Sequence, residues 1–419
     1  MNPTRALLVH AVAALAGMLE FSSPADQALS RYFRSHRSLG HRDRAFVAEA
    51  AFAVLRRRRS LEAAAGSARP RALLIAALVR VFGLSGRALQ GALEAGEQAL
   101  VARIRGFRAE SLAPAERADL PDWLWTLLAA EQGEPQATRI AEGLLDAAPL
   151  DLRVNLARLG RDEAISRLGA DGITAVPTPY SPAGIRLQGK PAINRHPLFA
   201  QGLVEVQDEG SQLLAYLLAP RRGEMVADYC AGAGGKTLAA AMLMRGSGRV
   251  YAMDVSPKRL AALAPRAARA GVTSIHRLAL AGENDARAQR LAGKMDRVLV
   301  DAPCSGFGTL RRNPDLKWRH GPAAVAEMAA KQRRILAAAA RLVKPGGRLV
   351  YATCSILHDE NEAVAENFAA SHAEFAPLAC AELLAAQRIS LAAGARLQLW
   401  PHVHGTDGFF AAAFERRAS

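Results

Sequence analysis

The chain has 419 residues, which is too long for one ordinary core and predicts two or three domains at ~100–200 residues per domain. Its 54 basic and 39 acidic side chains leave a formal net charge of +15, which favours a polyanionic partner such as nucleic acid. All but seven of the basic side chains are arginine, although a GC-rich genome gives the same bias. Four cysteines in so long a chain exclude a disulfide scaffold.

No apolar run approaches the ~20 residues of a membrane span. The apolar stretch at 6–15 is interrupted by His10, and its large apolar residues follow helical rather than signal-peptide spacing. We therefore expect a cytoplasmic protein with no membrane partner and no metal site, and a monomer is the simplest expectation.

Residues 1–120 are predicted to form an all-α bundle, with breaks near 22–24, 66–70 and 83–86 where Gly, Pro and Ser gather. This region carries 18 arginines against 10 acidic residues. The run of four arginines at 56–59 ends an apolar helix, so it fits both a helix C-terminus and an RNA contact.

Residues 121–200 are predicted to form a small α/β lobe, with a strand near 151–155, a helix at 161–168 and a proline-rich end. From 201 to 419, apolar strands alternate with Ala-rich helices, which predicts a doubly wound parallel sheet. Its expected strands are 225–229, 250–254, 296–301 and 347–353.

A small-residue loop follows the first of these strands and predicts a cofactor site. Such a loop is shared by NAD, nucleotide and S-adenosylmethionine binders, and it is not a P-loop because Ala231 stands five residues before Lys236. Asp254 ends the next strand, where a carboxylate accepts ribose hydroxyls, and it also suits a helix N-cap together with Ser256. Without a phosphate cradle, S-adenosylmethionine is favoured over a dinucleotide. The loop residues are Cys230, Ala231, Gly232, Ala233, Gly234, Gly235 and Lys236.

Two cysteines each follow an apolar strand, in Asp301-Ala302-Pro303-Cys304 and Tyr351-Ala352-Thr353-Cys354. An arbitrary free cysteine is most often a buried structural thiol. Strand ends of parallel sheets, however, are where ligands bind. Two thiols beside a carboxylate suit methylation of a pyrimidine at carbon 5, because a thiolate must first add to carbon 6 to make carbon 5 nucleophilic.

A segment with interleaved basic and aromatic residues follows Cys304, at 309–319. Such a loop suits clasping of RNA phosphates and stacking on a base, so Arg311, Arg312 and Lys317 are predicted RNA contacts. A solvated charged surface is the alternative interpretation.

From 204 to 414 the chain resembles the RsmB/Nop-type (Sun/Fmu) RNA cytosine-5 methyltransferases. The resemblance rests on the Pro-Cys and Thr-Cys motifs, Gln-Asp-Glu-Gly-Ser-Gln at 207–212 and Thr-Asp-Gly-Phe-Phe at 406–410. It implies a Rossmann-like methyltransferase domain in which Cys354 is the nucleophile and Cys304 serves product release. It further implies that the 230–236 loop lies along S-adenosylmethionine, that Asp254 binds its ribose, and that Asp301 and Lys236 lie near the target base.

Two departures from the family pattern stand out. Gly232-Ala233 replaces the usual Ala-Pro, and Ala281-Gly282 occupies the place of an acid expected near the adenine, which leaves Asp285 as the candidate. Residues 39–56 resemble part of a NusB-like RNA-binding bundle.

The resemblance implies methylation of ribosomal RNA, with 16S favoured and transfer RNA as the alternative. A DNA cytosine-5 methyltransferase would place its nucleophile in the Pro-Cys motif and carry a Glu-Asn-Val motif that this chain lacks. A non-catalytic RNA-binding assembly factor is a further alternative, which the two cysteines, Asp301 and Lys236 disfavour.

Overall fold

The computed structural model describes residues 3–418, and packing divides the chain into two units. Unit 1 comprises the described residues up to Ala147 together with Thr309–Pro322, and unit 2 comprises Ala148–Gly308 and the described residues from Ala323 onward. Across the described part of the chain, no helix combines the length and apolarity that crossing a membrane requires.

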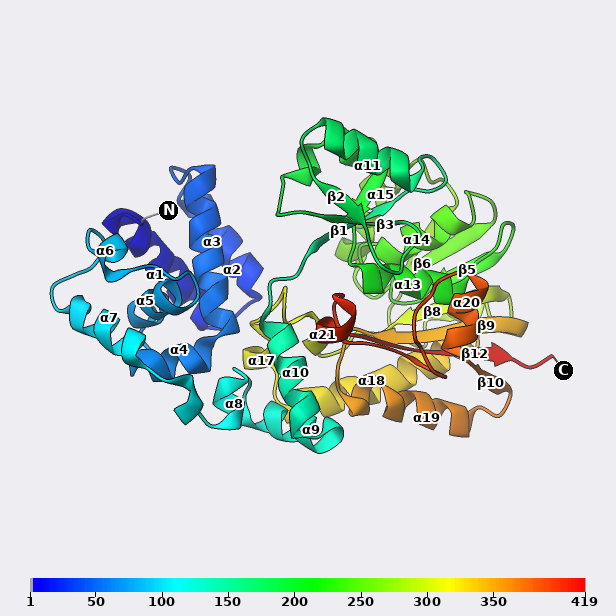
Figure 1. Ribbon diagram of the computed structural model, residues 1–419. Helices are drawn as coiled ribbons and strands as arrows, with labels where there is room; N and C mark the ends of the chain where they lie inside the picture. Colours follow the sequence, from blue (N-terminus) through cyan, green and yellow to red (C-terminus); the bar gives the residue numbers. More distant parts are fainter. Residues whose placement is uncertain (1–2, 419) are drawn as a thin grey trace. The chain divides into compact units, whose positions relative to one another are not determined.

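Unit 1 is helical, which confirms the predicted all-α region (Figure 1). The predicted breaks are all present, and at one of them Gly66 ends α4 with a positive φ of 63°. Its longer helices are α1 (Arg5–Leu19), α2 (Ala25–Ser35), α3 (His41–Arg56), α4 (Arg58–Ala65), α5 (Pro70–Arg80), α7 (Glu97–Gly106), α9 (Asp122–Gln132) and α10 (Glu134–Leu145). Its short helices are α6 (Gly86–Leu89), η1 (Ala109–Ser111), α8 (Pro114–Arg117) and α17 (Leu316–Arg319).

Helix α17 caps the carboxyl end of α3 inside unit 1. The Lys317 Nζ donates to the Arg56 carbonyl at 2.8 Å, and the Trp318 indole N–H donates to the Leu55 carbonyl at 2.8 Å. These are carbonyls that a helix end leaves without intrahelical partners. Lys317 is only 2% exposed, and this burial lowers its pKa to about 7, although the nearby Asp119 carboxylate opposes the shift.

Unit 2 begins with a four-stranded antiparallel sheet in the order β2-β3-β1-β4. This sheet confirms the expected small α/β lobe. Its elements are β1 (Leu150–Val154), α11 (Arg161–Ala170), β2 (Ala175–Pro177), β3 (Gly184–Leu187), η2 (Ile193–Arg195), α12 (Pro197–Ala200) and β4 (Val204–Val206). Whether 1–120, 121–200 and 201–419 fold as separate domains stays a prediction, and α9 and α10 pack within unit 1.

The large sheet of unit 2 has the order β10-β12-β9-β8-β5-β6-β7, with β11 pairing β12. Its strands β5 to β9 are parallel, as predicted, and β10 to β12 form an antiparallel extension. The strands are β5 (Met225–Asp228), β6 (Arg249–Asp254), β7 (Ile275–Ala279), β8 (Met295–Asp301), β9 (Val343–Thr353), β10 (Phe375–Leu378), β11 (Leu397–Leu399) and β12 (Phe409–Arg416).

Helices cover both faces of this sheet, because successive residues of a strand point to opposite sides. Leu349 and Tyr351 of β9 join one apolar cluster with α18 and α19, and Val350 and Ala352 join the other with α13 and α14. In Figure 1, α18 and α19 are both seen below the strands, and both contribute residues to the same apolar cluster. The helices of this region are α13 (Glu209–Leu218), α14 (Gly235–Leu243), α15 (Pro257–Ala270), α16 (Ala286–Gln289), η3 (Phe307–Thr309), α18 (Pro322–Ala340), η4 (His358–Glu360), α19 (Glu362–Ser371), α20 (Cys380–Ala386) and α21 (Pro401–His404).

The buried Lys317 predicts a pH-dependent stability of unit 1. The pKa of Lys317 is about 7 in the folded protein, against an ordinary value of 10.5. Between these two pH values the unfolded chain therefore holds a proton on Lys317 that the folded protein has released. The free energy of unfolding therefore rises with pH through this window. Lys317→Met should remove up to ~3 kcal/mol of the rise between about pH 7 and about pH 9.5.

Urea unfolding followed by tryptophan fluorescence measures this, because Trp123, Trp125 and Trp318 all lie in unit 1. An unchanged pH dependence in Lys317→Met would show that the lysine is not the titrating group.

Candidate active site

The two strand-end cysteines meet at one edge of the large sheet. Strands β8 and β9 pair in parallel with Asp301 opposite Ala352, and the Ala302 N–H extends the ladder to the Ala352 carbonyl at 2.9 Å. Both chains then leave the sheet, and the sulfurs of Cys304 and Cys354 lie 3.5 Å apart. The expectation that the two thiols share a sheet edge is confirmed.

The pKa of the Cys304 thiol is raised by its surroundings. The hydrogen bond with Cys354 is the largest influence on Cys304, followed by burial and by the negative charge of Glu360, and together they raise the pKa of Cys304 well above its usual range. A raised pKa favours the protonated form of Cys304, and the hydrogen bond joins its sulfur to that of Cys354. A thiol that acts as a nucleophile must lose its proton, and the raised pKa of Cys304 opposes this loss.

An ion pair lies beside the thiols. The Lys236 Nζ, on the first turn of α14, donates to the Asp301 carboxylate at 2.7 Å, and the ring of Phe409 lies 5.7 Å from the same Nζ. Burial opposes the charge on Lys236, but Asp301, Cys354 and Asp228 outweigh it and raise the pKa of Lys236. A fixed cation beside a sulfur nucleophile is a means of stabilising developing negative charge.

The small-residue loop has the backbone of a ligand cradle. Gly232 and Gly234 have positive φ values of 55° and 82°, and a Cβ on Gly234 would enter the side chain of Leu263. Helix α14 begins directly afterwards at Gly235, so its first N–H groups face the loop, where a helix N-terminus favours an anionic group.

Asp228 and Asp254 supply two buried carboxylates at the ends of the strands beside this loop. Asp228 accepts from the Thr237 hydroxyl through Oδ2, while its buried Oδ1 has no hydrogen-bond partner, and burial raises the pKa of Asp228 to about 7. Asp254 accepts from the N–H groups of Gly232 at 2.8 Å and Ser256 at 2.7 Å. The N-cap of α15 is Ser256, so Asp254 supports the cap and the glycine loop together. An unpartnered oxygen, a glycine cradle and a helix N-terminus fit the amino, carboxyl and ribose groups of S-adenosylmethionine.

Asp285 caps α16. Its carboxylate accepts from the Ala281 N–H at 2.8 Å and pairs with Arg287 at 2.7 Å, which lowers the pKa of Asp285. The structure therefore gives this residue a local role, and a contact with adenine stays a prediction.

The predicted RNA-binding loop is not a solvated surface. Arg311 is 5% exposed and Lys317 is 2% exposed, because both pack into unit 1 against the end of α3. The Arg311 carbonyl accepts from Arg56 at 3.0 Å. Arg311 and Lys317 are therefore buried in unit 1, whereas Arg312 is half-exposed, and RNA contact at all three positions stays a prediction.

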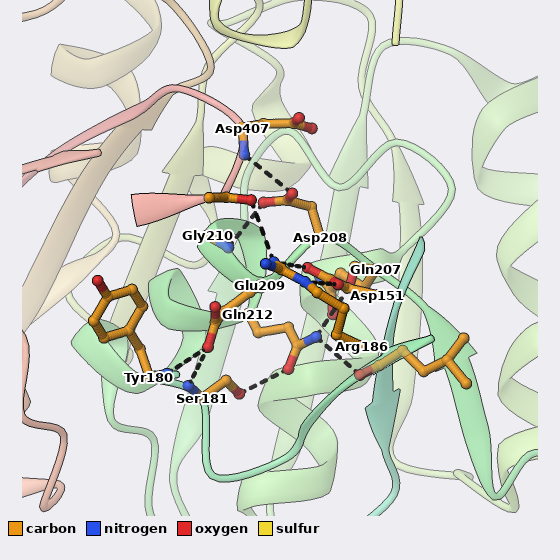
Figure 2. A network of polar contacts seen from close by, with 12 residues as sticks. Asp151, Tyr180, Ser181, Arg186, Gln207, Asp208, Glu209, Gly210, Gln212 and Asp407 are labelled. Atoms are coloured by element: carbon orange, nitrogen blue, oxygen red, sulfur yellow. Dashed lines mark hydrogen bonds and ion pairs between the residues drawn. The ribbon is translucent and has the colours of Figure 1, made fainter. Parts of the chain in front are cut away.

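The segment 207–212 forms a buried polar network at the junction of β4 and α13 (Figure 2). Glu209 accepts from the N–H of Ser181 at 2.7 Å, and burial raises the pKa of Glu209. Arg186 of β3 pairs with Asp151 of β1 at 2.8 Å. The network ties the four-stranded lobe to the region of the large sheet through hydrogen bonds rather than apolar contact alone.

The same network reaches the thiol site through the backbone. Asp208 accepts from the Asp407 N–H at 3.1 Å. The next residue, Gly408, donates to the Gly308 carbonyl at 2.8 Å, and the Gly308 N–H donates to the Cys354 carbonyl at 2.9 Å. The two glycines touch because neither has a side chain.

Comparisons with known proteins identify the family. Residues 215–415 match the family described as 16S rRNA methyltransferase RsmB/F, and 120–194 match its ferredoxin-like domain. The chain is 36% identical over 393 residues to the ribosomal RNA small subunit methyltransferase B of Xanthomonas campestris, covering 88% of each chain. This chain belongs to the RsmB/F family of ribosomal RNA methyltransferases.

A second curated relative and a solved structure are also similar to this chain. The probable ribosomal RNA small subunit methyltransferase B of Synechocystis is 36% identical over 311 residues, covering 73% of this chain and 69% of that protein. A crystal structure of a methyltransferase homologue from Pyrococcus horikoshii is 28% identical with a TM-score of 0.63, covering 74% of this chain and 100% of that one. The Rossmann-like methyltransferase fold is thereby confirmed.

The sequence analysis missed one group of residues in this RsmB/F-family site. Ser305 and Ser355 each follow a cysteine, and both donate to the buried Glu360. The repeated Cys-Ser dipeptide at the ends of two neighbouring parallel strands was a signal for this contact.

The close approach of the two glycines predicts a strong steric effect. A Cβ at Gly308 would lie 2.8 Å from the Cys354 carbonyl oxygen and closer still to that of Gly408. Gly308→Ala should therefore lower the free energy of unfolding of unit 2 by ~1–3 kcal/mol. Urea unfolding measures this, with Gly394→Ala as control because its Cβ meets nothing within 4 Å. Equal stability of the two variants would contradict the packing described.

Proposed function

We propose that this protein transfers a methyl group from S-adenosylmethionine to carbon 5 of a cytosine in ribosomal RNA, with 16S favoured. The observation that carries the proposal is the pair of sulfurs 3.5 Å apart, beside the ion pair of Lys236 and Asp301. The RNA class is supported by the RsmB/F family description and by the names of the Xanthomonas and Synechocystis relatives.

Different residues of the cofactor site would bind different groups of S-adenosylmethionine. Asp254 would accept the ribose hydroxyls, since a carboxylate has lone pairs beyond those used by Gly232 and Ser256. The free Oδ1 of Asp228 suits the amino group, and the first N–H groups of α14 suit the carboxylate. When bound, the cofactor supplies an electrophilic methyl group.

The thiols provide the nucleophile and the base. Carbon 5 of cytosine is unreactive until the Cys354 sulfur forms a bond to carbon 6, which pushes the ring electrons onto carbon 5. Carbon 5 then takes the methyl group as the bond between that group and the sulfonium sulfur breaks, and S-adenosylhomocysteine would be the leaving group. Cys304 first loses its own proton to solvent, and its thiolate then takes the proton from carbon 5. The double bond re-forms, and the bond between the Cys354 sulfur and carbon 6 breaks.

Lys236 and Asp301 hold the ring during these steps. The Asp301 carboxylate, at the end of β8, would accept from the exocyclic amine, and the Lys236 cation would balance the negative charge that the sulfur brings to the ring. The cytosine must be single-stranded or extruded to enter.

The unequal thiols predict opposite phenotypes. Cys354→Ala should abolish methyl transfer, because no bond to carbon 6 forms. Cys304→Ala should form the bond and fail to break it, leaving protein attached to RNA. Transfer of labelled methyl groups and denaturing gel electrophoresis measure the two outcomes. An adduct that persists in Cys354→Ala and needs Cys304 would reverse the assigned roles.

The favoured substrate predicts a change in cellular RNA. Bisulfite sequencing of RNA from a strain lacking the gene should show one cytosine of 16S ribosomal RNA that becomes convertible, and restoration of the gene should protect it again. Loss of protection confined to transfer RNA would show that the alternative substrate is correct.

A further inference from the structure

Glu360, a fully buried carboxylate in η4, lies behind the two cysteine loops. Its Oε1 accepts from the Ser305 N–H at 2.8 Å and from Gln332 at 3.1 Å. Its Oε2 accepts from the hydroxyls of Ser305 and Ser355, each at 2.5 Å. One side chain therefore binds the residue after each cysteine, and the two serine hydroxyls lie 3.2 Å apart.

Further hydrogen bonds hold the backbone of Glu360 and of the two cysteine loops. The Tyr351 hydroxyl of β9 donates to the Glu360 carbonyl at 2.5 Å, and Gln332 of α18 donates to the Pro303 carbonyl at 2.9 Å. Asn361 donates to the Ser355 carbonyl at 3.1 Å. These contacts leave the cysteine loops little freedom relative to β9 and α18.

A buried carboxylate is costly unless its oxygens are satisfied, and here all four hydrogen bonds come from neutral donors. Apolar packing would hold two loops together without that desolvation cost. The negative charge of Glu360 acts on the Cys304 thiol and on the Tyr351 hydroxyl, and of these two groups the thiol belongs to the candidate active site.

We propose that Glu360 is a positioning residue that fixes the spacing of Cys304 and Cys354, so that one sulfur reaches carbon 5 while the other is bonded to carbon 6. This inference rests on the proposed function, because carbons 5 and 6 are neighbours and both sulfurs must reach one ring. Its negative charge also contributes to the raised pKa of Cys304, which keeps that thiol protonated in the resting protein.

Three variants of the full chain separate the effect of Glu360 on the spacing of the thiols from the effect of its charge on Cys304. Glu360→Gln keeps the shape and removes the charge, and its amide N–H₂ can donate to serine hydroxyls that donate to the carboxylate in wild type. Glu360→Ala removes the ties to both loops. Asp359→Asn removes a charge from the exposed neighbour in the same turn and serves as the control.

The first measurement needs neither RNA nor cofactor. Diamide accepts two electrons and two protons from a pair of close thiols and leaves a disulfide, which peptide mass spectrometry detects. The Cys304–Cys354 disulfide should form at the same rate in wild type and Asp359→Asn, and ~10-fold more slowly in Glu360→Ala because the loops separate.

The second measurement follows release of the RNA adduct against pH. Removal of the negative charge lowers the pKa of Cys304, so the pH profile of release in Glu360→Gln should move to lower pH while KM for RNA stays within ~2-fold. In Glu360→Ala, kcat should fall ~100-fold and the adduct should accumulate.

A release profile of Glu360→Gln that coincides with wild type, or wild-type cross-linking in Glu360→Ala, overturns the proposal. If Glu360→Ala does not fold, the pH profile of adduct release in Glu360→Gln alone determines whether the proposal stands. If wild type methylates no cytosine, the proposed function fails, whereas the diamide measurement still tests the spacing role on the unliganded protein.

Discussion

The parallel pairing of β8 with β9 is the constraint on which the site depends. Its register sets Asp301 opposite Ala352, so both chains leave the sheet at the same edge and deliver their cysteines to within 3.5 Å. A slip of one residue would turn the side chains of a strand to the opposite face. The catalytic proposal, the ion pair with Lys236 and the role of Glu360 all require this one register.

Polar contacts rather than apolar packing set the geometry beyond the strand ends. Glu360 binds the residues that follow the cysteines, and the 207–212 network reaches Cys354 through the backbones of Asp407, Gly408 and Gly308. Hydrogen bonds fix direction as well as distance, which a site with two reacting sulfurs needs. The apolar clusters on both faces of the sheet supply the burial that makes these contacts strong.

Local patterns in the sequence were sufficient to predict the parallel sheet, the glycine loop and the position of the two thiols at one sheet edge. Short apolar runs ending in turn residues predicted β5, β6, β8 and β9, and the shared edge followed from parallel topology. The burial of Lys317 did not follow, because it depends on a contact with the end of α3, more than two hundred residues away in the chain. The tie between Ser305, Ser355 and Glu360 is likewise a tertiary contact, in which each residue alone resembles an ordinary loop residue.

The central claim is that Cys354 forms the bond to the base and Cys304 does not. RNA that carries 5-fluorocytidine at the target tests it in the wild-type protein, because fluorine at carbon 5 cannot be removed as a proton and the adduct persists. Tryptic digestion then separates the two cysteines, which lie in peptides 349–388 and 298–311. We expect mass spectrometry to find the nucleotide on Cys354 in the first peptide. A nucleotide attached to Cys304 in the second would contradict the account.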